Sequence, residues 1–180
     1  MSVFSRPFGT ARGLVRLLLS YAQVLAIPRA DPSKARRLVF VCSGNICRSA
    51  FADALARQLG ARAASFGLRT TGGMRAHPPV ALSAWRRRVD LGSHLTQTVG
   101  AFVPEPDDLY LVMEVRQIGM LREDPRFAHA SIDLLGRYAG FPHIHDPFEL
   151  DASYVETSLD RIDRAVRKLV RKSVSARADG

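Results

Sequence analysis

The sequence predicts a single α/β domain in which a four-stranded parallel sheet has helices on both faces, preceded by an N-terminal helical extension. Two observations predict this fold. Short, mainly apolar runs alternate with longer segments of helical periodicity, which is typical of buried parallel strands joined by crossover helices. In addition, 47% of the 180 residues are apolar and 24% are charged, an ordinary composition for a chain long enough to bury a core.

The first 37 residues are predicted to be an extension, and the domain is placed at residues 38–180. The extension contains an uncharged apolar run, residues 17–27, between arginines. As a helix these 11 residues would be about 16 Å long, too short to cross a hydrocarbon core of about 30 Å. Three interpretations are open: a helix packed on its own domain, an amphipathic helix that docks residues 10–27 on a membrane surface or a partner, or the start of a signal peptide.

Within the domain, strands and helices are predicted in alternation. The strands are expected at residues 38–41, 62–66, 109–113 and 132–135. The helices are expected at residues 47–59, 79–89, 114–121 and 155–170. In the last helix apolar residues recur at spacings of 4, 3, 4 and 3 from Val155 to Leu169, which forms one apolar stripe. Trp85, in the second helix, is predicted to lie in the core rather than at a ligand site.

The formal net charge of +9 is concentrated at the two ends of the chain. Residues 1–37 carry seven basic and one acidic side chain, residues 161–180 carry seven and two, and the middle of the chain carries 12 and 14. The central domain is therefore slightly acidic, and we expect it to have no nucleic-acid partner. The basic residues of the last helix are expected to form a solvated face.

The segment that carries the chemistry, Cys-Ser-Gly-Asn-Ile-Cys-Arg-Ser at residues 42–49, lies between the first predicted strand and the first predicted helix. Ligands of open α/β sheets bind beyond the carboxyl ends of the strands, where a helix N-terminus offers free N–H groups and a positive dipole end to an anion. Gly44 is expected to relax the backbone so that these N–H groups converge, and Arg48 offers a planar fork of donors that suits phosphate. We therefore predict a cradle for a phosphate-sized oxyanion.

Cys42 ends the predicted strand, faces the cradle and is the predicted nucleophile. A free thiol is only about 3% ionised at pH 7, but a helix N-terminus and a nearby arginine can lower its pKa by several units. Ser49 is expected to donate a hydrogen bond to the sulfur, and Asn45 to pin the loop through side-chain hydrogen bonds. The alternative, a buried structural cysteine beside a helix cap, does not account for Gly, Asn, Arg and Ser all standing where an anion loop needs them.

This segment resembles the signature loop of the low-molecular-weight protein tyrosine phosphatases of the bacterial type, although Ala50 stands where the family usually has proline. The resemblance covers roughly residues 38–172. It implies hydrolysis of phosphotyrosine through a phosphocysteine intermediate, with Cys42 as the nucleophile and with Arg48 and the loop amides binding the phosphate. The loop residues that it places against the substrate are Ser43, Gly44, Asn45, Ile46, Cys47 and Ser49.

A second motif, Asp146-Pro147-Phe148, resembles the family's Asp-Pro-aromatic loop. The resemblance implies that Asp146 protonates the departing phenolate and then takes a proton from the water that attacks the phosphocysteine. Pro147 would fix the backbone beside it, and Phe148 would form an aromatic wall for the substrate ring. Glu149 stands where many relatives carry a second tyrosine, so regulation through that tyrosine is not expected.

Smaller matches lie between the two motifs. Ser65 and His94 match positions that support the loop asparagine in the family, although a generic buried polar pair is an alternative interpretation of both. By the same resemblance, Leu68 would lie on the rim of the pocket. Gln97 stands where many relatives have an arginine, which weakens the match at that point.

Other activities of the same fold remain as alternatives. Arsenate reductases need further cysteines to pass a disulfide along, and none follows Cys47. Arginine phosphatases have threonine where this chain has Ile46, and the apolar residue favours an aryl phosphate. A catalytically silent anion-binding or regulatory relative is the third alternative. Cys47 itself could form a reversible disulfide with Cys42 or pack at the helix start.

We expect neither a metal nor another cofactor, because the two histidines and one carboxylate of residues 143–146 are too few ligands on one strand. The expected partner, by resemblance to relatives encoded near bacterial exopolysaccharide pathways, is a phosphotyrosine protein such as the tyrosine-rich tail of a bacterial tyrosine kinase. A reactive thiolate favours the reducing cytoplasm, which argues against a signal peptide. If the extension docks on a membrane, the protein would lie at its inner face.

Overall fold

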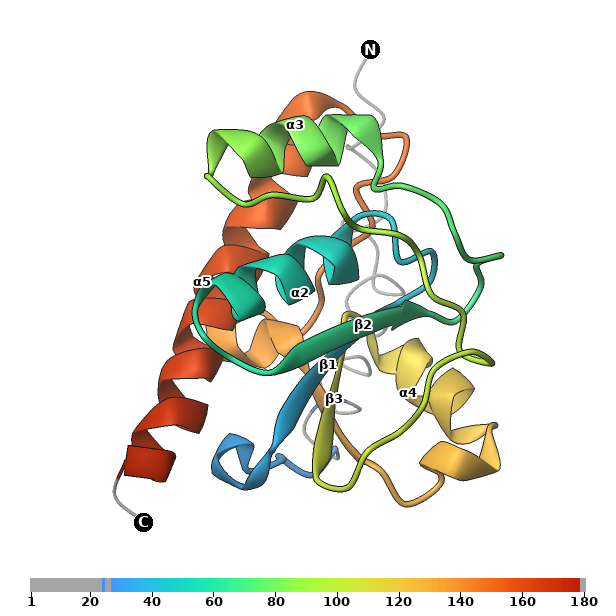
Figure 1. Ribbon diagram of the computed structural model, residues 1–180, viewed down its shortest axis with the longest axis vertical. Helices are drawn as coiled ribbons and strands as arrows, with labels where there is room; N and C mark the ends of the chain where they lie inside the picture. Colours follow the sequence, from blue (N-terminus) through green and yellow to red (C-terminus); the bar gives the residue numbers. More distant parts are fainter. Residues whose placement is uncertain (1–23, 25–26, 179–180) are drawn as a thin grey trace, which may run out of the picture.

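The computed structural model describes Val24 and residues 27–178, with side chains as far as Ser173. Within this part of the chain, four parallel strands form one sheet in the order β2-β1-β3-β4. The strands are β1 (Arg37–Cys42), β2 (Ala63–Gly67), β3 (Asp108–Val112) and β4 (Ser131–Leu134). Helices lie on both sides of the sheet (Figure 1), so the predicted fold class is confirmed.

The connections between strands are helical, as predicted. The α-helices of the described residues are α2 (Arg48–Gln58), α3 (Pro78–Arg86), α4 (Val115–Arg122) and α5 (Ala152–Ala178). Short 3-10 turns occur at η1 (Pro32–Lys34), η2 (Pro125–Phe127) and η3 (Leu135–Ala139). Every strand and helix predicted from residue 38 onward is present, with ends that differ by a few residues except at the longer α5.

The central strand explains why the core has two halves. From Leu38 onward β1 is buried on both faces, which is why its sequence is apolar from that residue to its end. Leu38 and Phe40 join the hydrophobic cluster formed with α2 and α5. Val39 and Val41 join the cluster on the other face, which includes α4 and η2. Figure 1 shows α2 and α5 together on one side of the sheet and α4 on the other.

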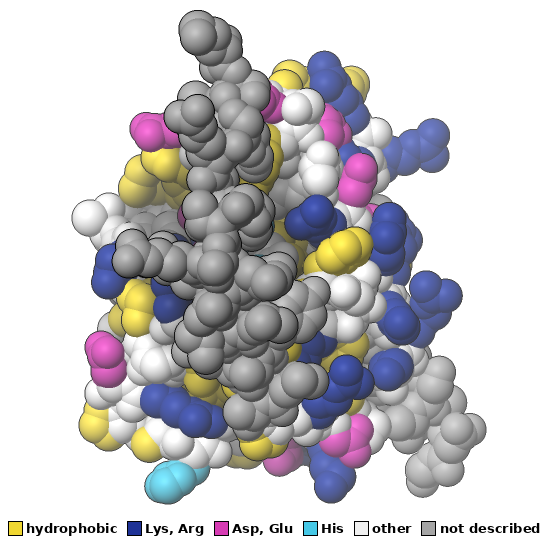
Figure 2. Space-filling view, turned by 180° about the vertical axis from the view of Figure 1, so that it is seen from behind, with side chains coloured by type: hydrophobic (Ala, Val, Ile, Leu, Met, Phe, Trp, Pro, Cys, Tyr) yellow, Lys and Arg dark blue, Asp and Glu magenta, His cyan; other side chains and the backbone are white. Residues whose placement is uncertain are grey.

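The last helix covers one face of the molecule. The predicted apolar stripe of α5 is confirmed, because Val155, Leu159, Ile162, Val166 and Leu169 are all buried. Its lysines and arginines from Arg164 to Lys172 lie on the outside, and Figure 2 shows Lys and Arg side chains gathered along the edge that α5 forms. The described residues include no helix both long and apolar enough to span a bilayer.

The N-terminal extension lies outside the described residues except at Val24 and the segment from Ile27 onward. Val24 is buried in the cluster on the α4 face of the sheet. The Arg137 side chain donates to the carbonyl oxygen of Val24 and, at 2.9 Å, to that of Ile27. At these two residues the extension contacts the domain, and the docking of residues 10–27 elsewhere stays a prediction.

Trp85 is not in the core, contrary to the prediction: it is 73% exposed. The buried residues of α3 are Val80, Ser83 and Ala84. Each helical residue is turned by about 100° from the last, so Trp85 lies about 140° around the helix axis from Val80. Trp85 therefore points away from Val80 and the buried face of α3.

The strand order places one position of the sheet at a topological switch point. After β1 the chain crosses to β2 on one side of β1 and then to β3 on the other. Connections that leave in opposite directions open a crevice beyond the carboxyl end of the first strand. Cys42 is the last residue of β1, so the predicted nucleophile stands at this crevice.

Candidate active site

The Cys42 sulfur lies at the base of the loop between β1 and α2, with only 2% of the residue exposed. The Asn45 N–H donates to Sγ at 3.2 Å, and Ser49 Oγ lies 3.0 Å from Sγ. Because Ser49 Oγ already accepts a hydrogen bond from Asn45 Nδ2, at 2.9 Å, its own proton is free to point at the sulfur. Two donors therefore converge on Cys42, an arrangement that stabilises negative charge on sulfur.

Asn45 fixes the shape of the loop through hydrogen bonds made by both the nitrogen and the oxygen of its side-chain amide. Its φ of 55° is in the left-handed region, which asparagine tolerates better than most residues. Nδ2 also donates to Ser65 Oγ at 3.0 Å, and Oδ1 accepts from the Gln97 N–H at 2.9 Å. The Asn45 carbonyl lies 2.7 Å from His94 Nε2, which must carry the proton because a carbonyl only accepts. Ser65 and His94 thus both contact the asparagine that the sequence pairs them with.

Gly44 does not adopt the left-handed backbone conformation that glycine permits and that would have relaxed the loop. Its φ is not positive, and a side-chain carbon at this position would touch only Ile46, at 3.4 Å. The left-handed residue is the next one, Asn45. The expectation that Gly44 relaxes the backbone is therefore wrong, and Gly44 instead forms part of the pocket wall.

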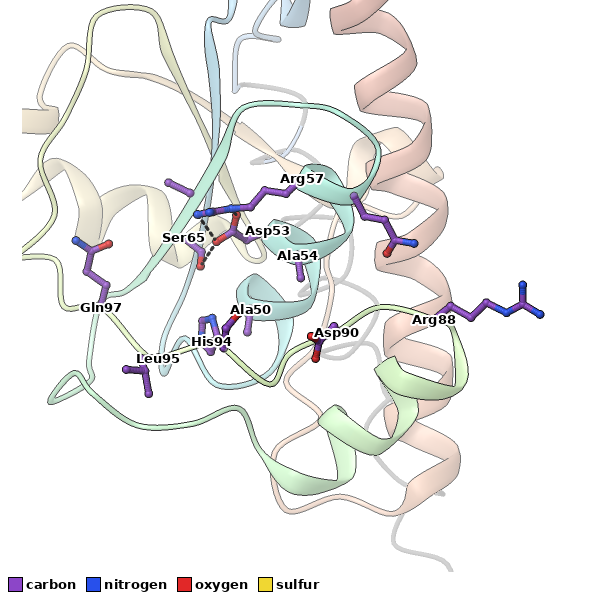
Figure 3. Close-up of a pocket in the computed structure, with 13 residues that line it drawn as sticks. Ala50, Asp53, Ala54, Arg57, Ser65, Arg88, Asp90, His94, Leu95 and Gln97 are labelled. Carbon is purple, nitrogen blue, oxygen red and sulfur yellow. Dashed lines mark hydrogen bonds and ion pairs between the residues drawn. The ribbon is translucent and has the colours of Figure 1, made fainter.

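A chain of hydrogen bonds leads from Asn45 through Ser65 to Asp53 and Arg57 on α2. Ser65 Oγ donates to Asp53 Oδ2 at 3.0 Å, and Arg57 Nε donates to Asp53 Oδ1 at 2.7 Å. Figure 3 shows these side chains at a rear cavity of about 590 Å³, whose wall also includes His94. Sequence reasoning missed Asp53, although it lies one helical turn after Ser49 and therefore on the same face of α2.

Arg48 is buried beneath the pocket with no exposed surface. Nη1 donates to Glu114 Oε1 at 2.6 Å and to the Ile144 carbonyl at 2.8 Å, and Nη2 donates to Asp146 Oδ2 at 2.5 Å. Burial opposes the charge, but the negative groups of Cys42, Asp146 and Glu114 outweigh it and raise the pKa of Arg48. Within the described residues Nε has no partner, so a buried donor is left for an anion oxygen.

Glu114 is a site residue that sequence reasoning did not single out. It follows β3, the strand paired with β1, and its carboxylate binds both Arg48 and Arg116, the latter at 2.8 Å. Burial acts to raise the pKa of Glu114, but the hydrogen bonds and charges of these two arginines outweigh it and hold the pKa below its usual range. Its position in the sequence could have identified it as a site residue, because residues that follow neighbouring parallel strands meet at one edge of the sheet.

Asp146 is far from Cys42 in the sequence, yet both side chains line one pocket. The Asp146 side chain is 40% exposed, with Oδ2 on Arg48 and Oδ1 accepting from the Phe148 N–H at 3.3 Å. Pro147 is buried, and the partly exposed Phe148 ring lies 5.1 Å from the ring of His77. The two motifs are therefore brought together around a half-exposed carboxylate.

The pocket has a volume of about 620 Å³. Its wall is formed by Cys42, Ser43, Gly44, Ile46, Cys47, Arg69, Thr70, Thr71, Met74, Asp146 and Phe148. Asn45, Arg48 and Ser49 lie buried beneath this wall. Leu68, predicted at the rim, instead packs partly buried against the cluster that includes Val41, and the residues after it line the pocket in its place. Residues 69–74 carry no motif that could have predicted their position.

Cys47 lines the same pocket, and both cysteines are free thiols. Burial, together with the negative charges of Asp146 and Cys42, raises the pKa of Cys47 to about 12. The Cys47 thiol therefore stays protonated near neutral pH. Of the two sulfurs, only Cys42 receives the converging donors described above.

Comparison with known proteins gives one consistent family. The family model of the low molecular weight phosphotyrosine protein phosphatases matches residues 37–179. The chain is 30% identical over 133 residues to a probable low molecular weight protein-tyrosine-phosphatase, EpsP of Ralstonia nicotianae, covering 73% of this chain and 91% of that protein. It is 28% identical over 134 residues to the low molecular weight protein-tyrosine-phosphatase Wzb of Salmonella typhi, covering 73% and 90%. The crystal structure of the tyrosine phosphatase AmsI from Erwinia amylovora superposes with a TM-score of 0.71 at 27% identity, over 76% of this chain and 92% of AmsI.

Proposed function

The chain belongs to the low molecular weight phosphotyrosine protein phosphatase family, and on this premise we propose that it hydrolyses phosphotyrosine in proteins through a phosphocysteine intermediate. One observation carries the proposal. The Cys42 sulfur, which receives two hydrogen-bond donors, and the Asp146 carboxylate line the same pocket above a buried Arg48. A nucleophile, a proton donor and a cation for the phosphate thus stand around one space.

The first step forms a bond between Cys42 Sγ and phosphorus. The phosphoryl oxygens accept hydrogen bonds from the loop N–H groups other than that of Asn45, which points at the sulfur, and from the unpartnered Nε of Arg48. As the S–P bond forms, the bond from phosphorus to the tyrosine oxygen breaks and its electrons go to that oxygen. A phenolate leaves more readily when it is protonated as it departs, and Asp146 supplies this proton.

Binding of the substrate prepares Asp146 for that role. In the free site Asp146 Oδ2 accepts a hydrogen bond from Arg48 Nη2. A phosphate dianion competes for the same guanidinium and places negative charge beside the carboxylate. This competition would release the Asp146 carboxyl group from Arg48, so that it can serve the leaving oxygen in the first step.

The second step removes the phosphoryl group from the enzyme. Asp146, now a carboxylate, takes a proton from a water molecule whose oxygen attacks phosphorus. The S–P bond breaks, its electrons return to Cys42 Sγ, and inorganic phosphate leaves. The Ser49 hydroxyl, 3.0 Å from the sulfur, stabilises the departing thiolate in this step.

The pocket wall supports an aryl phosphate as the substrate group. Ile46, Met74 and Phe148 give the wall an apolar character above the polar cradle. An aromatic ring fits such a wall better than the charged guanidinium of phosphoarginine. We take the substrate to be a phosphotyrosine protein, with a bacterial tyrosine kinase as one candidate, and the compartment to be the cytoplasm, where thiols stay reduced.

Hydrolysis of para-nitrophenyl phosphate between pH 5 and 7 tests the proposal. The protein should turn over this substrate, and Cys42→Ser should lose turnover while it still binds vanadate. Folded protein without measurable hydrolysis would leave an anion-binding or regulatory relative as the correct interpretation. Retained activity in Cys42→Ser would exclude the covalent mechanism.

A further inference from the structure

Helix α3 presents two large apolar side chains to solvent. Leu82 is 52% exposed and Trp85 is 73% exposed, and both lie on the side opposite the buried Val80 and Ala84. Pro79, one turn before Leu82, is exposed on the same side. We call Pro79, Leu82 and Trp85 the α3 ridge. Large exposed apolar side chains that share one face are typical of a surface that binds another molecule.

The α3 ridge begins at the wall of the pocket. His77, the residue before α3, donates its N–H to the Ile46 carbonyl at 2.9 Å, which ties the start of the helix to the signature loop. The His77 ring lies 5.1 Å from the Phe148 ring, and Phe148 lines the pocket. From this point the nine residues of α3 extend about 13 Å outward. The α3 ridge therefore starts beside the pocket wall and leads away from it to Trp85.

We infer that the α3 ridge binds the polypeptide that flanks the phosphotyrosine and takes an apolar side chain about four residues away from it. This inference rests on the proposed function. An extended peptide rises about 3.3 Å per residue, so about four residues cover the length of α3. A phosphotyrosine held in the pocket leaves its own chain at the rim, where the ridge starts. Tryptophan is among the residues that contribute most at such interfaces.

Charge favours a substrate segment over a second copy of this chain. The exposed side chains of Arg69, on the pocket wall, and Arg75, just before α3, place positive charge near the pocket end of the ridge, whereas Arg86 at the other end is paired with Glu156. Two copies that met through this surface would bring like charges together. A phosphopeptide with acidic residues around its apolar side chain matches both features.

Kinetics with matched peptides test the inference. One phosphotyrosine peptide carries leucine at the fourth residue on each side of the phosphotyrosine, and its partner carries serine there. The native protein should hydrolyse the leucine peptide with a kcat/KM about tenfold higher, and the double variant L82A/W85A should remove this preference. Hydrolysis of para-nitrophenyl phosphate, which does not reach α3, should change less than twofold.

Val103 supplies a matched control, because it is also 73% exposed but lies in the segment before β3. Val103→Ala should keep the tenfold preference. A native protein without preference for leucine would overturn the inference, and so would a double variant that keeps it. Absence of para-nitrophenyl phosphate turnover in the native protein would instead mean that the proposed function has failed.

Fluorescence gives an independent readout, because Trp85 is the only tryptophan in the 180 residues. In Cys42→Ser, the leucine phosphopeptide should shift the emission to shorter wavelength, since it covers an indole that is now in water. Phenyl phosphate should bind and leave the emission unchanged. No shift at a peptide concentration that displaces vanadate would contradict the inference. A shift that grows with protein concentration alone would assign the ridge to a second copy and would also contradict it.

Discussion

The signature loop and helix α3 lie next to each other at the pocket, yet they use their residues in opposite ways. In the loop, residues 42–49, the polar side chains of Asn45 and Ser49 are buried and hydrogen-bonded within the protein. In α3, the largest side chain, Trp85, faces solvent. The loop is held in place by hydrogen bonds within the protein, whereas the α3 ridge faces solvent. Changes in the loop should therefore affect every substrate, and changes on the α3 ridge should affect only large substrates.

The largest effect is expected from Asp146→Ala, on the pocket wall opposite the loop that holds Cys42. Without a proton donor, kcat for a phenyl ester should fall by on the order of 10² to 10³, while KM changes little. A substrate whose leaving group needs no proton should lose much less. Stopped-flow assays with a series of substituted phenyl phosphates measure both. Equal losses across the series would place the general acid elsewhere.

Asn45→Ala should have the next largest effect, because the Asn45 side-chain amide makes three hydrogen bonds that alanine cannot make. We expect a loss of about 2 to 4 kcal/mol in the free energy of unfolding and roughly a hundredfold lower kcat. Asn45→Gly is the matched control, since glycine adopts the left-handed φ of 55° without strain but lacks the amide. If the glycine variant restores activity, the loop depends on backbone shape and not on the amide.

Glu114→Gln should weaken the support of Arg48 in a pH-dependent way. The pKa of Glu114 is lowered in the folded protein, so its contribution to stability is present above its usual value of 4.5 and is lost as the pH falls through the lowered value. Urea unfolding at pH 7 should show a loss of about 1 to 2 kcal/mol. At pH 3 the gap between native protein and variant should be smaller. A gap that widens in acid would contradict the ion pair.

Trp85→Ala should have the smallest effect, a change within about 0.5 kcal/mol in the free energy of unfolding, because an exposed side chain makes few contacts with the rest of the protein. Val80→Ala, on the buried face of the same helix, should cost about 2 kcal/mol. Thermal unfolding of both variants compares the two faces directly. A large loss in Trp85→Ala would mean that the indole is packed against the fold after all.

The sequence predicted the strands and helices well for a physical reason. A parallel strand buried on both faces, such as β1 from Leu38 onward, is expected to be apolar, and the apolar stripe of α5 must repeat with the helix period. The contacts of Asn45 and Ser49 were also predictable, because a buried polar group in an anion loop has few places to bond.

The residues that the sequence misplaced or did not reveal also have physical explanations. Trp85 was misplaced because apolar character does not by itself say which side of a helix is buried, and the angular positions pointed outward. Glu114 and Asp53 were missed because each acts through another residue, Arg48 or Ser65, and not through a motif of its own. Leu68 was misplaced because the residues after a strand can turn to either side, and here the next three line the pocket.

The central claim, that Cys42 carries the phosphoryl group during turnover, has a direct test. Native protein is mixed with a phosphotyrosine peptide that carries labelled phosphate, quenched within one turnover, digested and examined by mass spectrometry. The label should appear on the fragment that contains Cys42, on the Cys42 sulfur, and should be absent in Cys42→Ser. Label on Cys47, or hydrolysis that proceeds without any labelled fragment, would contradict the account.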